Sequence, residues 1–107
     1  MQNLTTPELA AWIANSSRQK PVLLDVREPW EFRACHINGA LTMPMNTLPG
    51  KLSELNAAQP IVCICHHGVR SMQVALFLER NGFTHISNLA GGVHAWARQV
   101  DGTMPTY

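Results

Sequence analysis

The sequence has little of what several large classes of protein need. Its 107 residues include only three cysteines and 14% charged side chains, and the formal net charge is +1. Three cysteines cannot form a disulfide framework, and a near-neutral balance gives no electrostatic basis for binding nucleic acid or a membrane surface. The longest apolar runs fall far short of the ~20 residues of a membrane span, and residues 1–6 lack the basic and apolar regions of a secretory signal. We therefore expect a cytoplasmic protein with neither nucleic acid nor a membrane as a partner.

The apolar content is sufficient for a core. Hydrophobic residues make up 46% of the chain, and a chain of this length fits one domain, residues 1–107. Short β-branched runs predict strands at 22–26, 40–43, 61–64 and 85–89. Helical patterns begin near residues 6, 29, 48, 71 and 93. This alternation predicts an α/β fold with a mostly parallel central sheet and helices on both faces.

The most informative stretch is the loop between the run 61–64 and the helix expected from Ser71. It opens with Cys65 and closes with Arg70. A loop between a buried strand and a helix turns backbone N–H groups toward one point, where the helix dipole adds partial positive charge. Cys65 is aimed at that point, so a thiolate there would be stabilised and nucleophilic. The other residues of this predicted site are His66, His67, Gly68, Val69 and Arg70.

The run 22–26 ends in a second polar cluster, which consists of Asp25, Arg27 and Glu28. Loops at the carboxyl ends of parallel strands meet at one edge of the sheet, so these side chains are expected to support the Cys65 site. Asp25 and Arg27 can equally form a local ion pair that holds the turn. The two interpretations are compatible.

The sequence predicts no metal site. The obvious ligand set is Cys63, Cys65, His66 and His67, but side chains so close along the chain rarely all reach one ion. A second ligand pair at zinc spacing is not apparent elsewhere.

Taken together, the motifs resemble the rhodanese family of sulfurtransferases in its single-domain form. The similarity lies in residues 23–28, continued by 31–32 and 36–40, in the loop 65–71, and in residues 88–92 with Trp96. It implies that Cys65 takes the outer sulfur of a small donor such as thiosulfate and holds it as a persulfide. An acceptor then removes the sulfur: cyanide in an assay, and a thiol or carrier protein in the cell. The resemblance implies no cofactor.

Several residues keep two interpretations. Arg70 either contacts the donor anion, as Arg27 and the histidines also could, or pins the loop through Glu28 or Asp25, and we expect pinning to dominate. His66 and His67 are expected to face solvent rather than act as general bases. Cys35 is expected to be a small packed residue rather than a second thiol at the entrance to the Cys65 site.

Two other functions compete with sulfur transfer. A phosphatase or arsenate reductase also uses a cysteine, a ring of N–H groups and an arginine. Here the spacing is Cys-x4-Arg, whereas phosphatases use Cys-x5-Arg, and no general-acid aspartate follows the loop. A non-catalytic rhodanese module is the second alternative, but such modules usually lack the cysteine. We therefore predict an enzyme.

Overall fold

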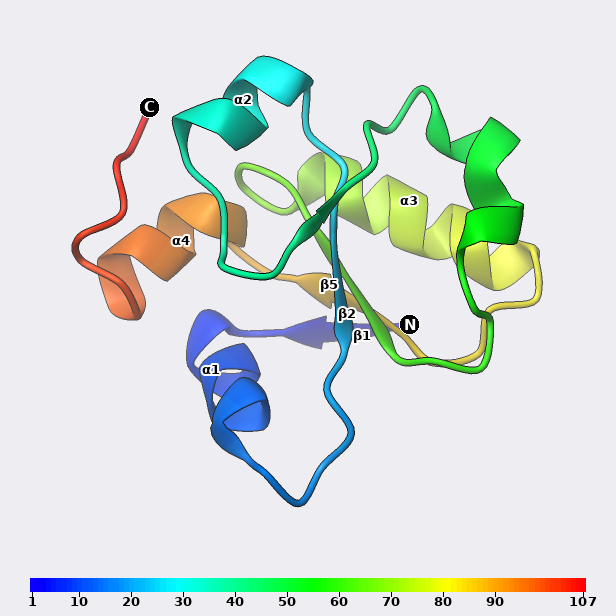
Figure 1. The fold of residues 1–107 in the computed structure, drawn as a ribbon, viewed down its shortest axis with the longest axis horizontal. Helices are drawn as coiled ribbons and strands as arrows, with labels where there is room; N and C mark the ends of the chain where they lie inside the picture. Colours follow the sequence, from blue (N-terminus) through cyan, green and yellow to red (C-terminus); the bar gives the residue numbers. More distant parts are fainter.

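The computed structural model describes residues 1–107, and a five-stranded sheet runs through its centre (Figure 1). Its strands are β1 (Gln2–Leu4), β2 (Val22–Asp25), β3 (Leu41–Thr42), β4 (Ile61–Ile64) and β5 (Ile86–Leu89). The spatial order is β1-β5-β4-β2-β3, and every neighbouring pair is parallel. The prediction of an α/β fold with a parallel sheet is confirmed, and β4 holds the central position.

Helices cover both faces of this sheet. They are α1 (Thr6–Ala14), α2 (Pro29–Ala34), the 3-10 helix η1 (Leu48–Glu54), α3 (Val69–Arg80) and α4 (Gly92–Gln99). Alternate residues of β4 point to opposite faces. Cys63 packs with residues of α3 and η1, and Val62 packs with residues of α1 and α4. The central strand is therefore buried on both sides, which explains its unbroken apolar sequence.

Local signals placed most helix starts correctly. Thr5 and Glu8 form the capping box expected from their spacing: the Glu8 N–H donates to Thr5 Oγ1 (3.2 Å), and the Thr5 N–H donates to Glu8 Oε1 (2.8 Å). The segment after Thr47 is a 3-10 helix, with Pro49 and Gly50 in its first turn. No helix in the structure combines the length and apolar character that crossing a membrane requires.

Two elements differ from expectation. Strand β1 was missed because it has three residues, two of them polar, and gains its order only by pairing with β5. Helix α3 begins at Val69 rather than Ser71, because Gly68 takes a left-handed conformation (φ +106°) and turns the chain directly into the helix. Arg70 therefore lies in the first turn of α3.

Candidate active site

Cys65 directly follows β4 and places its sulfur at the amino end of α3. The residue is 1% exposed. Its Sγ accepts the backbone N–H of Gly68 at 3.0 Å and lies 3.2 Å from the hydroxyl oxygen of Ser71. A Cβ on Gly68 would lie 3.2 Å from the Gly91 nitrogen and 3.3 Å from the Leu89 oxygen, so glycine allows both the turn and its close approach to β5. The predicted helix N-terminus lies beside the sulfur, but of the several N–H groups expected there only that of Gly68 donates to it.

Ser71, next to the Cys65 sulfur, forms a hydrogen-bonded pair with Asn88. Asn88, buried on β5, donates through Nδ2 to Asn3 Oδ1 and to the Gly68 carbonyl, both at 3.1 Å. Its Oδ1 therefore faces Ser71, whose hydroxyl lies 2.5 Å away. A hydroxyl has one proton, so Ser71 can donate it to Asn88 or turn it toward Cys65. Asn88 belongs to a motif that the sequence shares with the family, but no role at the sulfur was predicted for it; its signal was a polar side chain within an apolar strand.

Arg70 is pinned by a carboxylate, as expected, but the partner is Glu31 of α2. Nη1 donates to Oε1 at 2.7 Å and Nη2 donates to Oε2 at 2.8 Å, a two-pronged contact that only arginine can make. The expected partners were wrong: Asp25 is bonded to Arg27, and Glu28 is an exposed residue that precedes α2. Hydrogen bonds from Arg70 lower the pKa of Glu31 to about 2, against the opposing effect of burial.

Asp25 and Arg27 form the buried local ion pair that the sequence allowed. Asp25 accepts Arg27 Nε at 2.9 Å and Nη2 at 2.7 Å, and both residues are at most 1% exposed. Arg27 also donates to the Cys35 carbonyl and, at 2.8 Å, to the hydroxyl of Tyr107. That hydroxyl donates to Glu31 Oε2 at 2.7 Å. Because Arg27 is fully buried and bonded, it contributes no free donor to an incoming anion.

The other two cysteines are placed for packing. Cys63 is fully buried on β4, and burial, followed by the charge of Cys65, raises the pKa of its thiol to about 12. Cys35 caps the end of α2 on the opposite face of the sheet from Cys63 and is 7% exposed. All three cysteines are free thiols.

The glycines that follow β5 dock α4 against the cysteine loop. The N–H groups of Val93 and His94 donate to the carbonyls of Cys65 and His66, at 3.0 and 3.1 Å. A Cβ on Gly92 would lie 2.4 Å from both carbonyl oxygens, so only glycine permits this approach. The loop and α4 therefore hold a fixed register.

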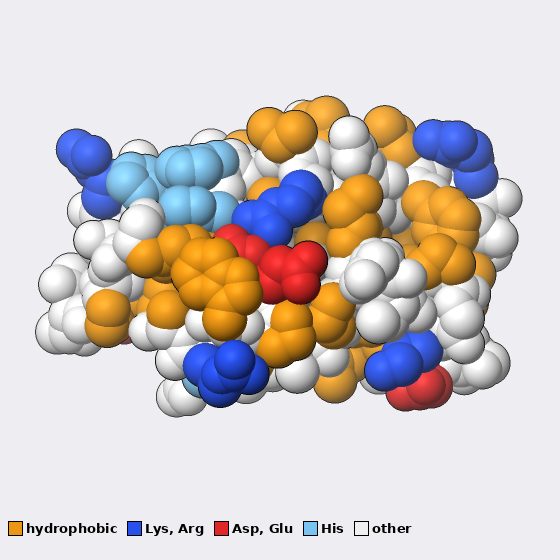
Figure 2. All heavy atoms as spheres, turned by 90° about the horizontal axis from the view of Figure 1, so that it is seen from above, with side chains coloured by type: hydrophobic (Ala, Val, Ile, Leu, Met, Phe, Trp, Pro, Cys, Tyr) orange, Lys and Arg blue, Asp and Glu red, His pale blue; other side chains and the backbone are white.

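Histidines border the loop on its outer side. Figure 2 views the end of the molecule that carries α2, and histidine side chains gather there beside basic and acidic groups. His67 is exposed, as expected, but His66 is half-buried and stacks on Tyr107 with ring centroids 4.0 Å apart. Burial, and then the neighbouring His67, lower the pKa of His66. The sequence did not foresee the third member, His94, or the contribution of Tyr107.

Comparison with known proteins agrees with this geometry. Residues 5–99 match the model of the rhodanese-like domain. The chain is 38% identical over 77 residues to a sulfurtransferase of Allochromatium vinosum, covering 72% of each chain. It is 34% identical to a probable adenylyltransferase/sulfurtransferase, MoeZ, of Mycobacterium tuberculosis, covering 97% of this chain but 26% of the relative. The structure superimposes on the crystal structure of a rhodanese-like domain protein from Staphylococcus aureus with a TM-score of 0.85 and 33% identity, over 100% of this chain and 99% of that one.

Proposed function

This chain belongs to the rhodanese-like domain family, and we propose that it moves a sulfane sulfur through a Cys65 persulfide. The similarity of the chain to proteins named as sulfurtransferases supports sulfur transfer in general. The observation that carries the proposal is the environment of Cys65 Sγ, which accepts an N–H at 3.0 Å and lies 3.2 Å from a hydroxyl, at the N-terminus of a helix. These groups stabilise negative charge on sulfur.

The donor that we propose is a small sulfane compound such as thiosulfate. The Cys65 thiolate attacks the outer sulfur, the sulfur–sulfur bond of thiosulfate breaks, and sulfite leaves with the bonding electron pair. Cys65 is left as a persulfide anion, whose charge the Gly68 N–H and the N-terminus of α3 would help to stabilise. Attack by a thiolate needs no general base, so neither His66 nor His67 is required to move a proton.

The acceptor attacks the outer sulfur of the persulfide and regenerates the Cys65 thiolate. Cyanide would serve in an assay; in the cell we propose a thiol or a carrier protein. The likeness to a probable adenylyltransferase/sulfurtransferase supports a protein acceptor. We also propose a cytoplasmic location, where free thiols such as Cys35, Cys63 and Cys65 stay reduced.

The intact mass of the protein tests this function. After incubation with thiosulfate, the wild type should gain one sulfur atom, which a reductant or cyanide removes. Cys65→Ser should gain none, while Cys35→Ala and Cys63→Ala should gain one, because both cysteines pack in the core. A sulfur adduct on Cys65→Ser would contradict the assignment. Aryl phosphates should not be hydrolysed, since the loop has the shorter Cys-x4-Arg spacing.

A further inference from the structure

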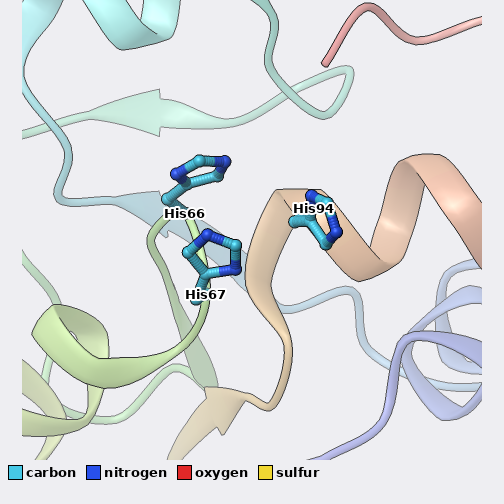
Figure 3. Close-up of side chains that lie close together, drawn as sticks. All are labelled: His66, His67 and His94. Carbon is cyan, nitrogen blue, oxygen red and sulfur yellow. The ribbon is translucent and has the colours of Figure 1, made fainter. Parts of the chain in front are cut away.

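Three imidazoles of the chain gather beside the cysteine loop. His66 and His67 follow Cys65 directly, and His94 lies in the first turn of α4. When one ring nitrogen is taken from each histidine, the three nitrogens all lie within 4.8 Å of one another. Figure 3 shows the rings of His66 and His67 on one side of a gap and that of His94 on the other. We propose that these three side chains bind one divalent transition-metal ion, with Zn²⁺ as the best fit.

The chemistry of the donors favours this assignment. Three neutral imidazoles suit Zn²⁺, Ni²⁺ and Cu²⁺, and three histidines with one open position are a common zinc environment. Zinc–nitrogen bonds of about 2.0–2.1 Å put the nitrogens of a tetrahedral site about 3.4 Å apart. Separations of up to 4.8 Å therefore have to close by little more than 1 Å. The exposed His67 side chain is free to rotate and would contribute to that movement.

The backbone already brings the ligands together. The His94 N–H donates to the His66 carbonyl at 3.1 Å, so the loop and α4 cannot drift apart without breaking this bond. The rings are inclined to one another, by 77° between His66 and His94 and by 49° between His67 and His94. Ligands that share one ion can have ring planes inclined in this way.

The strongest single observation is His94 itself. Its Nδ1 is buried and has no hydrogen-bond partner. A buried polar atom without a partner costs free energy and is uncommon in folded proteins. A neutral imidazole nitrogen can give its lone pair to a metal ion, so a bound ion would supply the partner that this nitrogen lacks.

The site stands apart from the reacting sulfur. Cys65 Sγ faces Gly68 and Ser71 on the side of α3, whereas the imidazoles gather against α4. Both share the loop backbone, so a bound ion would hold the loop against α4 without occupying the sulfur. Metal binding can therefore be measured independently of sulfur transfer.

Calorimetric titration of the purified, reduced protein with Zn²⁺ at pH 7.5 tests the proposal. The wild type should bind one equivalent, and His94→Gln should weaken the association by at least about tenfold. The His94 side chain makes no hydrogen bond in the structure, so the substitution removes no native bond; circular dichroism should confirm an unchanged fold. His85→Gln is the matched control, an exposed histidine outside the cluster, and should bind as the wild type does.

A spectroscopic probe separates nitrogen from sulfur ligation. Co²⁺ bound by the histidines should give visible d–d bands without a thiolate-to-metal charge-transfer band, and Cys65→Ser should keep the visible bands. The proposal is overturned if His94→Gln binds Zn²⁺ as tightly as the wild type. It is equally overturned if Cys65→Ser abolishes binding or if Co²⁺ shows thiolate charge transfer, because the ion would then lie on the sulfur.

Discussion

Strands β2 and β4 are neighbours in the sheet, and the polar side chains at their carboxyl ends have opposite environments. After β2, the charges of Asp25 and Arg27 neutralise one another, and the remaining Arg27 donors are bonded to backbone and to Tyr107. After β4, Cys65 Sγ has an N–H and a hydroxyl beside it and no charged partner. At one end the charges are paired within the chain, whereas at the other the sulfur has polar neighbours but no ion-pair partner.

The difference shows how to separate structural from chemical residues at one edge of a sheet. A buried arginine whose donors are all used has no free energy to gain from a substrate anion. A sulfur at a helix N-terminus gains further stabilisation when it becomes charged. Arg70 links the two regions, because it starts in the helix of the cysteine loop and ends on Glu31 of α2.

The largest change in stability should come from removing the buried ion pair between Asp25 and Arg27 at the end of β2. Arg27→Met leaves the carboxylate of Asp25 buried without its charge partner, and losing one member of such a pair costs about 3–5 kcal/mol. Urea unfolding should show this loss as a lower midpoint with an unchanged slope. Arg33→Met, at an exposed arginine in the last turn of α2, is the control and should stay within about 0.5 kcal/mol of the wild type.

The same measurement on Cys65→Ser completes the contrast. This variant should lose persulfide formation altogether and change the free energy of unfolding by roughly 1 kcal/mol or less. If Arg27→Met were as stable as Arg33→Met, the β2 cluster would not be structural. The comparison between the two strand ends would then fail.

The fold was largely predictable because its signals are local. A strand buried on both faces must be apolar throughout, so the run 61–64 was visible in the sequence, as was the capping box at Thr5. Strand β1 was not visible, since a short edge strand with polar residues depends on β5 for its order.

In the site, Cys65 and its loop were predictable because strand, loop and helix are consecutive. The long-range partners were not. Glu31 lies 39 residues before Arg70 and looks like any acid in a short helix. His94 reaches the loop only through the close approach that Gly92 permits, and Tyr107 reaches Arg27 and Glu31 only through the path of the tail (Figure 1).

The contact between Arg70 and Glu31 joins the two regions, and it is tested by replacing the arginine with a cation of another shape and the same charge. A lysine at position 70 is a point charge that cannot hold both Glu31 oxygens, so Arg70→Lys should be nearly as harmful as Arg70→Ala. We expect both to lower kcat/KM for thiosulfate by about tenfold, roughly 1.4 kcal/mol of transition-state stabilisation. If the lysine variant keeps most of the wild-type activity, the positive charge toward the donor matters more than the pinning.

The smallest expected effect concerns the pH dependence of that bridge. The pKa of Glu31 is about 2 in the folded protein and 4.5 without the fold, because Arg70 and Tyr107 donate to its carboxylate. A lowered folded pKa means that the stabilisation is complete above pH 4.5 and is lost as the pH falls from about 4.5 toward 2. These pKa values correspond to about 2 kcal/mol of stability lost by pH 3. Because the Arg70 side chain is 36% exposed and solvent screens the pair, we expect the wild type to lose roughly 1 kcal/mol more unfolding free energy than Glu31→Gln between pH 6 and pH 3. The glutamine variant starts from a lower stability but lacks this titration, so urea midpoints at the two pH values isolate the effect of residue 31 from the other carboxylates. Equal losses in the two proteins would mean that the contact between Arg70 and Glu31 is too weak in solution to fix the loop, and the link between the two strand ends would have to be abandoned.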